Sequence, residues 1–297
     1  MCEGDNQAET AKAQRMTESF QPLSGLADIA IEYDAIFCDI WGVVHNGRRP
    51  NFAACGALER YRDEVGPVVL MSNTSRPSVL VPESFAHIEM PDGFFDAIVT
   101  SGDAIINELA RRSPGPAFLI GLIDEADSEG FGLFDQVPMN FADMDDAAFV
   151  VCTRPYDYGD AVEEYEELLS DLLARDLEMV CTNPDVKVKV DGREVMCAGA
   201  IAQMYEQMGG TVVYGGKPHP PIYQLGRAWL EETLGYAPER ILMIGDNLFT
   251  DVLGAQREGL DCLFIQDGLY GKTAAEFRAL CERHGLSARY QLPELAW

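Results

Sequence analysis

Short apolar runs alternate along the chain with segments whose apolar residues recur at helical spacing. Apolar runs of strand length lie at 35–39, 67–73, 95–101, 211–218, 241–247 and 262–268. Helical patterns follow them, the clearest at 53–64, 221–234, 251–258 and 274–284. Short apolar strands that alternate with helices are typical of a parallel sheet covered on both faces. The pattern therefore predicts an α/β fold.

The middle of the chain has its own set of elements. Strand candidates lie at 115–121, 147–153, 178–183 and 186–190, with helices expected at 161–174 and 198–208. A block of roughly 95 residues is far longer than an ordinary connection between neighbouring elements. We therefore expect a smaller α/β domain inserted at 114–210, a main domain formed by 25–113 and 211–297, and a mobile N-terminal tail at 1–24.

Composition narrows the partners. A formal charge of −27, from 49 acidic and 22 basic residues, disfavours binding to nucleic acid or to an anionic membrane surface. No apolar stretch is long enough to span a membrane. Eight cysteines without a CxxC pair indicate free thiols in a reducing compartment, so we expect a cytoplasmic protein. An anionic substrate would need a metal ion or a lysine within the site.

Polar residues stand at the ends of four apolar runs, where parallel sheets bind ligands. They are Asp39, Ser72 with Asn73, Lys217, and Asp246 with Asn247, and Asp251 lies five residues beyond Asp246. Each alone is more often a helix cap or turn residue, but together they favour chemistry. Clustered carboxylates need a cation, and Mg²⁺ prefers oxygen ligands. Beside such a metal, Asp39 could attack phosphorus and form an aspartyl-phosphate.

Four segments resemble, in order and spacing, the signature motifs of the haloacid dehalogenase (HAD) superfamily. They are DIWGVVHNG (39–47), SNTSRP (72–77), GGKP (215–218) and IGDNLFTD (244–251). The segment CTNPD (181–185) is similar to one found in the class IIA members, the 4-nitrophenylphosphatase-like and sugar- or nucleotide-phosphatase-like enzymes. The resemblance covers about residues 30–275 and implies a Rossmann-like HAD core with a large inserted α/β cap.

The resemblance also implies roles for the residues that bind phosphate. Asp39 matches the nucleophile, and Lys217 matches the lysine that holds nucleophile and phosphate together. Ser72 and Asn73 match the phosphate-binding motif. In the cap segment that faces the site in relatives, the candidates for substrate contact are Asn183 and Asp185.

A Mg²⁺ site is implied by the same motifs. Asp39 and Asp246 match direct metal ligands, and Asp251 matches the acid that supports the water shell of the metal. The backbone carbonyl of Trp41 matches the remaining protein ligand, because it occupies the position of the second aspartate of the family.

Trp41 departs from the family pattern. The second aspartate serves phosphatases as general acid and base, which typically contributes about 10²–10⁴-fold to the rate, and an indole cannot ionise. Another residue could carry the proton, and the candidates are His45, His219 and Asp185. His45 follows the motif directly, and histidine titrates near neutral pH.

Three functions follow from this departure. The first is a Mg²⁺-dependent phosphatase that acts on a small phosphorylated metabolite, with a cap that opens and closes and a homodimer formed through it. The second is a weak phosphatase, or a pseudo-phosphatase that binds metal and phosphate as a sensor. The third is dehalogenation, which is disfavoured because dehalogenases need no metal and this chain keeps Asp246 and Asp251.

Overall fold

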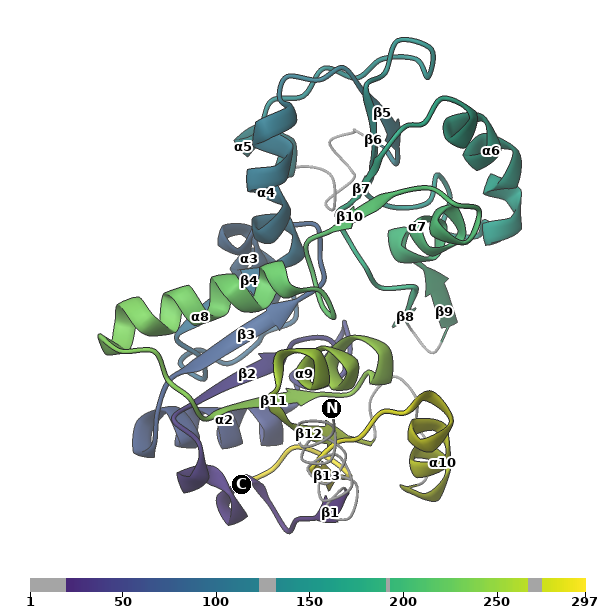
Figure 1. Cartoon of the computed structure of the whole chain (residues 1–297). Coiled ribbons are helices and arrows are strands. Elements are labelled where there is room, and N and C mark those ends of the chain that lie inside the picture. The colour runs from purple at the N-terminus through teal and green to yellow at the C-terminus, as the bar shows by residue number, and fades with distance from the viewer. Residues whose placement is uncertain (1–19, 123–131, 191–192, 267–273) are drawn as a thin grey trace, which may run out of the picture.

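The computed structural model describes residues 20–122, 132–190, 193–266 and 274–297. The lower part in Figure 1 is built on a seven-stranded sheet in which every paired neighbour is parallel. Its strand order is β1 (Gln21–Pro22), β13 (Tyr290–Leu292), β12 (Asp261–Ile265), β11 (Ile241–Gly245), β2 (Ala35–Asp39), β3 (Val68–Ser72) and β4 (Ala97–Thr100). The expected α/β fold is confirmed.

Helices cover both faces of this sheet because its strands are apolar on both sides. Ile36 and Cys38 of β2 pack in one core with α2 (Phe52–Glu64) and α3 (Val81–His87). Phe37, between them, packs in the opposite core with α8 (Pro220–Leu234), α9 (Leu253–Glu258) and α10 (Ala274–His284). β2 is therefore buried along its whole length, which leaves only its carboxyl end open to a ligand.

Local sequence signals set the starts of two helices, α2 and α4 (Ser101–Arg112). The Asn51 side chain accepts the N–H of Ala54 at 3.2 Å and caps α2. Thr100 and Asp103 form a reciprocal capping box at the start of α4. Such caps satisfy N–H groups that have no partner within the helix.

A second sheet forms the upper part in Figure 1. It is parallel, with the order β10 (Val212–Tyr214), β7 (Met179–Cys181), β6 (Phe149–Cys152) and β5 (Ala117–Ile120). One face packs on α6 (Glu166–Ala174) and α7 (Ala198–Gln207). The other packs on α4 and α5 (Leu133–Gln136). An antiparallel hairpin of β8 (Lys187–Val190) and β9 (Arg193–Met196) lies between the two sheets.

Single turns complete the described elements. They are the 3₁₀ turns η1 (Leu26–Asp28), η2 (Ala30–Glu32), η3 (Ser78–Leu80) and η4 (Val162–Tyr165), and the π-helical turn η5 (Leu248–Val252). Short π-helical turns inside helices occur frequently at functional sites, and η5 carries Asp251.

Strand β10 differs from the sequence prediction. The run at 211–218 was expected in the same sheet as the other terminal strands, yet Val213 pairs with Val180 of β7 in the upper sheet. An apolar run shows that a strand is buried but does not show which sheet edge it joins. The chain therefore returns to the lower sheet only after Tyr214, and the division into 25–113, 114–210 and 211–297 stays a prediction.

The N-terminal segment also differs where it is described. Residues 1–19 of the expected mobile tail lie outside the described residues. Beyond them, Gln21 and Pro22 pair with β13. Phe20 is buried and meets the ring of Phe277 edge-on. The pairing partner of β1 is the C-terminal strand β13. The polar sequence around β1 therefore gave no sign that a strand begins there.

Two further expectations concern the compartment and the membrane. The seven cysteines among the described residues are all buried and free, as predicted. None of the described helices is long and apolar enough to cross a membrane.

Candidate active site

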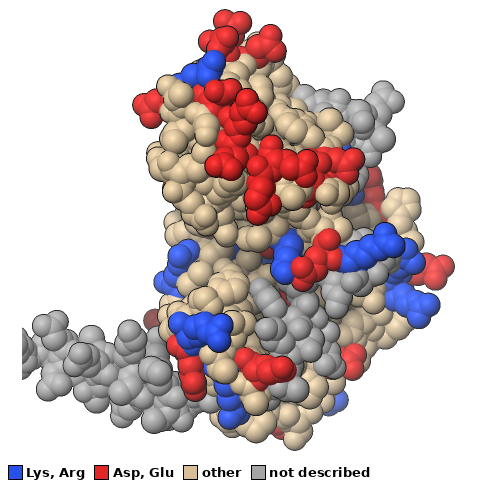
Figure 2. All heavy atoms as spheres, turned by 90° about the vertical axis from the view of Figure 1, so that its right-hand side faces the viewer, with Lys and Arg blue, Asp and Glu red and all other residues tan. Residues whose placement is uncertain are grey.

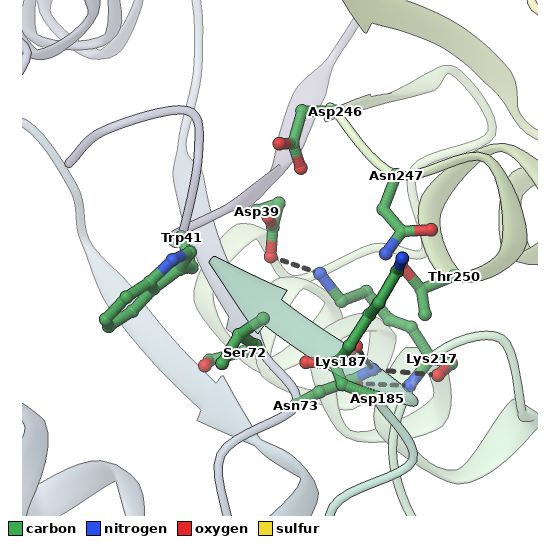
Figure 3. Close-up of a pocket in the computed structure, with 11 residues that line it drawn as sticks. Asp39, Trp41, Ser72, Asn73, Asp185, Lys187, Lys217, Asp246, Asn247 and Thr250 are labelled. Atoms are coloured by element: carbon green, nitrogen blue, oxygen red, sulfur yellow. Dashed lines mark hydrogen bonds and ion pairs between the residues drawn. The ribbon is translucent and has the colours of Figure 1, made fainter. Parts of the chain in front are cut away.

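A small cavity lies where the carboxyl ends of β2, β3 and β11 meet the hairpin of β8 and β9 (Figure 3). These three strands are neighbours in the sheet, which brings together residues far apart in the sequence. The cavity measures about 30 Å³. It is lined by Asp39, Trp41, Ser72, Asn73, Asp185, Lys187, Val188, Lys217, Asp246, Asn247 and Thr250.

Lys217 is the buried cation of the site. Its ammonium group contacts the carboxylate of Asp39 and lies 2.8 Å from Oδ1 of Asp251, and the lysine side chain is only 2% exposed. It also donates to the carbonyl of Met71 at 3.3 Å. Burial by itself would lower the pKa of Lys217, but the ion pairs with Asp251 and Asp39 outweigh it and raise that pKa. The lysine is therefore protonated and can meet an anion beside Asp39.

Asn73 holds Lys217 in place through its backbone. The N–H of Lys217 donates to Oδ1 of Asn73 at 2.7 Å, and Nδ2 of Asn73 donates to the carbonyl of Lys217 at 2.9 Å. The same Nδ2 donates to Oδ1 of Asp185 at 2.9 Å. The amide of Asn73 is thus engaged on both sides, and in this structure it positions Lys217 and Asp185.

Ser72 is the neighbouring residue predicted to bind phosphate. It ends β3 and lines the cavity. Its hydroxyl oxygen accepts the N–H of Thr74 at 3.2 Å. A hydroxyl that accepts one hydrogen bond keeps its own hydrogen to donate, so Ser72 can offer a donor to a phosphate oxygen.

Three buried carboxylates gather beside the lysine. Ligand oxygens of Asp39, Asp246 and Asp251 all lie within 4.8 Å of one another, and these residues are 7%, 2% and 0% exposed. Burial raises the pKa of Asp39 well above its ordinary value, and Asp251 and Asp246 raise it further against the opposing effect of Lys217. A hard divalent cation prefers oxygen ligands of this kind and would relieve their repulsion. The donor set therefore fits a metal such as Mg²⁺.

Backbone geometry allows this close approach. Gly42 follows the β2 motif with a φ of +90°, and a Cβ built there would collide with the Asp246 carboxylate. Only glycine adopts this conformation readily and leaves the needed space. Asp251 is oriented by the N–H of Asn247, which donates to its Oδ2 at 3.1 Å.

Trp41 forms one wall of the cavity. Its ring meets the imidazole of His45 edge-on, with ring centroids 5.1 Å apart. A Cβ at Gly47 would come within 2.5 Å of the indole, so the loop packs closely beneath the ring. Trp41 therefore presents an apolar surface to the cavity two residues after Asp39.

The two candidate histidines do not line the cavity. His45 accepts the N–H of Gly47 at its Nδ1 (2.9 Å), and burial lowers its pKa to about 4. His219 stacks on Tyr214 at 4.3 Å, and burial, with Arg257, lowers its pKa to about 4 as well. Both imidazoles are neutral near pH 7. The structure gives no support to the expectation that His45 shuttles the proton.

The segment 181–185, which was predicted to belong to the cap, contributes Asp185 to the cavity but not Asn183. Burial raises the pKa of Asp185 from 3.8 to about 6, against the opposing effects of Lys217 and the Asn73 hydrogen bond. Asn183 is buried outside the lining and accepts the N–H of Asp185 at its Oδ1 (3.0 Å). Asn183 thus shapes the turn that presents Asp185.

Three lining residues were absent from the predicted site: Lys187, Val188 and Thr250. Thr250 lies one residue before Asp251, within the motif segment itself. The alternating segment VKVKV begins directly after CTNPD. Side chains alternate along a strand, and Lys187 lies two residues after Asp185. This spacing could have shown that Lys187 faces the same way as Asp185.

Comparison with known proteins identifies the family. Residues 36–130 match the haloacid dehalogenase-like hydrolase model, and 214–284 match a HAD-hydrolase-like model. A solved hydrolase of the haloacid dehalogenase-like family from Brucella suis 1330 is 35% identical, with a TM-score of 0.81. The alignment covers 92% of this chain and all of that one. The chain belongs to the haloacid dehalogenase-like hydrolase family.

The chain is also similar to two phosphatases, one in sequence and one in fold. Ribonucleotide monophosphatase NagD of Escherichia coli K12 is 28% identical over 79% of this chain and 88% of its own length. A glycerol phosphate phosphatase of Mycobacterium tuberculosis, solved with magnesium, shares the fold with a TM-score of 0.63 at 20% identity. The alignment covers 90% of this chain and 76% of that one.

Proposed function

We propose that this HAD hydrolase is a Mg²⁺-dependent phosphatase that hydrolyses a small phosphomonoester through an aspartyl-phosphate on Asp39. The observation that carries this proposal is the contact of protonated Lys217 with Asp39 beside the cluster completed by Asp246 and Asp251. A nucleophile, a phosphate-binding cation and an oxygen-rich metal site then stand at one sheet edge. The names of NagD and of the mycobacterial enzyme, both phosphatases, support it.

The geometry suggests how the residues divide the work. Asp39, Asp246 and the Trp41 carbonyl would hold Mg²⁺, with Asp251 supporting its water shell. When bound, the metal neutralises charge on the phosphoryl group. Lys217 and Ser72 bind phosphate oxygens while Asp39 attacks phosphorus and the bond to the leaving oxygen breaks. Water then attacks phosphorus, releases inorganic phosphate and restores the Asp39 carboxylate.

Substrate entry requires the cap side to move. A water molecule needs about 10–15 Å³ of cavity volume, so a cavity of about 30 Å³ holds about two waters. A phosphomonoester is larger. Two short contacts join the sides: Ser75 Oγ lies 2.6 Å from Thr182 Oγ1, and Asn73 binds Asp185. Opening would break them, and closure would exclude water from the phosphoryl group.

Asp185 is the residue that we propose for the proton role lost at Trp41. It lines the cavity, whereas His45 and His219 do not. With a pKa of about 6, about a tenth of the Asp185 carboxyl is protonated at pH 7, and this fraction can act as a general acid. Asp185 would protonate the leaving oxygen as its bond to phosphorus breaks.

The Asp185→Asn variant tests this role through leaving-group dependence and pH. We expect kcat for glycerol 3-phosphate to fall by about 10²-fold, because an alkoxide leaves poorly without a proton. Hydrolysis of 4-nitrophenyl phosphate should fall much less. In the wild type, the alkyl-ester rate should decrease as pH rises through about 6, where Asp185 loses its proton. Equal losses on both esters, with an unchanged pH profile, would remove Asp185 from this role.

The activity itself is tested by phosphate release from both esters with and without Mg²⁺. We expect turnover only with the metal. Mg²⁺ should also raise the melting temperature, since a ligand at about 100 times its Kd adds about 2.7 kcal/mol of stability. The Asp246→Asn variant should lose both effects, because it removes one of the clustered carboxylates. Equal turnover in a metal-free buffer would contradict the proposal.

The apolar wall at Trp41 favours one alternative, a pseudo-phosphatase that binds metal and phosphate without useful turnover. It predicts the same stabilisation by Mg²⁺ but no phosphate release from either ester, even as a burst. A small phosphorylated metabolite as ligand, a cytoplasmic location, a homodimer through the cap and the absence of nucleic-acid or membrane partners remain predictions.

A further inference from the structure

Lys187 is a second cation in the site, contributed by the cap-side hairpin. Figure 3 shows its side chain pointing from β8 into the cavity, which it lines together with Asn247. Its Nζ donates to Oε1 of Glu194 on β9 at 2.7 Å. The lysine and glutamate side chains are 42% and 64% exposed.

The two lysines of the cavity are held very differently. Lys217 is 2% exposed and paired with two buried carboxylates. If it moved away, these carboxylates would be left buried without a compensating charge. Among the described residues, Lys187 pairs with Glu194 on the protein surface, and exposed pairs of this kind contribute little to stability. Glu194 can therefore be exchanged for another anion at small cost.

The charge around the cavity makes such a cation necessary for one class of ligand. Three carboxylates line the cavity, from Asp39, Asp185 and Asp246. The surface adds to their field, since the chain carries −27. Figure 2 shows acidic side chains spread over the cap side of one face, with basic side chains gathered lower, where the two parts meet. A second negative group on a substrate would be repelled here unless a cation met it.

We propose that Lys187 exchanges Glu194 for a second anionic group of the substrate, so that the site selects phosphate esters that also carry a carboxylate or a further phosphate. Lys217 and Ser72 then bind the phosphoryl group that is cleaved, and Lys187 binds the distal anion from the cap side. This inference rests on the proposed function for the identity of the ligand as a phosphate ester.

The test uses two phosphonates that cannot be hydrolysed and differ in one group. These are 3-phosphonopropionate, which carries a carboxylate, and propylphosphonate, which carries a methyl group instead. Isothermal titration with Mg²⁺ present should show the first binding to the wild type about tenfold tighter, or about 1.4 kcal/mol. Lys187→Met should abolish this preference and leave the Kd of propylphosphonate within about twofold.

Matched variants on the same hairpin separate a local contact from a general loss of charge. Arg193→Met removes one positive charge from exposed β9, outside the cavity lining, and should keep the preference. Glu194→Gln frees Lys187 and should tighten binding of 3-phosphonopropionate. Melting temperatures close to wild type would show that each variant is folded.

Clear outcomes overturn the inference. They are a wild type with no preference, a Lys187→Met variant that keeps it, or no binding of 3-phosphonopropionate. Because neither probe is cleaved, the result holds whether or not the protein turns over esters. Failure of the phosphatase function would instead appear as absent phosphate release.

Discussion

Replacing Asp39 by asparagine is expected to lower kcat for 4-nitrophenyl phosphate by on the order of 10⁴-fold or more, as loss of a covalent nucleophile does. The amide has nearly the same shape but cannot attack phosphorus. Lys217 keeps its ion pair with Asp251 at 2.8 Å, so the phosphate pocket should retain its charge and substrate should still bind. Steady-state phosphate release measures the loss.

A second measurement ties this loss to the covalent step. Acid quenching of the wild type during turnover should trap protein that is heavier by one phosphoryl group, and Asp39→Asn should show none. The matched control is Asp145→Asn, at a side chain that is 82% exposed and pairs with Arg175, which should keep full activity. If Asp39→Asn retained about a tenth of the wild-type rate or more, Asp39 would not be the nucleophile.

Replacing Trp41 by aspartate is expected to raise kcat for glycerol 3-phosphate by about 10²-fold, the lower end of what a proton shuttle contributes. A carboxylate would then stand two residues after Asp39, where family members carry their general acid and base. Hydrolysis of 4-nitrophenyl phosphate should change little, because its leaving group needs no proton. Rates on the two esters, measured in parallel, give the comparison.

The control for this gain is Trp41→Asn, because asparagine has the size of aspartate but its amide cannot donate and accept a proton as a carboxyl group does. Both variants lose the packing of the indole against His45 and Gly47, so both should melt at a lower temperature. Full loss of a buried tryptophan typically costs about 3–5 kcal/mol, and Trp41, which is partly exposed, should cost less. Equal rates for Trp41→Asp and Trp41→Asn would refute the account of a missing acid.

Combining Trp41→Asp with Asp185→Asn connects the two proton candidates. If Asp185 carries the proton in the wild type, an aspartate at position 41 should restore alkyl-ester hydrolysis to Asp185→Asn. Two variants that act on one step are expected to deviate from additivity. Independent, multiplicative effects would place Asp185 in another step.

The strands and the motif residues were predictable because they depend on local pattern. The run 35–39 is apolar and ends in an acid, and it became β2 with Asp39 at the cavity. Likewise Ser72 ends β3, and Asp246 directly follows β11. In a parallel sheet, carboxyl ends share one edge, so residues that follow strands converge whatever their separation in the sequence.

Roles that depend on pairing across the fold were not predictable in the same way. The Asn73 amide clamps the Lys217 backbone, a contact between residues 144 positions apart. His45 lies close to Asp39 in sequence, yet its burial and its bond from Gly47 keep it out of the cavity. Strand β10 pairs with β7 in the upper sheet. Its apolar sequence does not show which strand it pairs with.

By itself, the sequence determined the α/β fold and the chemistry of the strand ends, because periodicity and residue type act locally. The tertiary structure alone decided which polar groups share one cavity. It placed Asp185 and Lys187 in the cavity with the carboxylates of the sheet. His45 and His219 do not line that cavity. Burial and charge then follow from that arrangement, since the pKa of a side chain depends on everything packed around it.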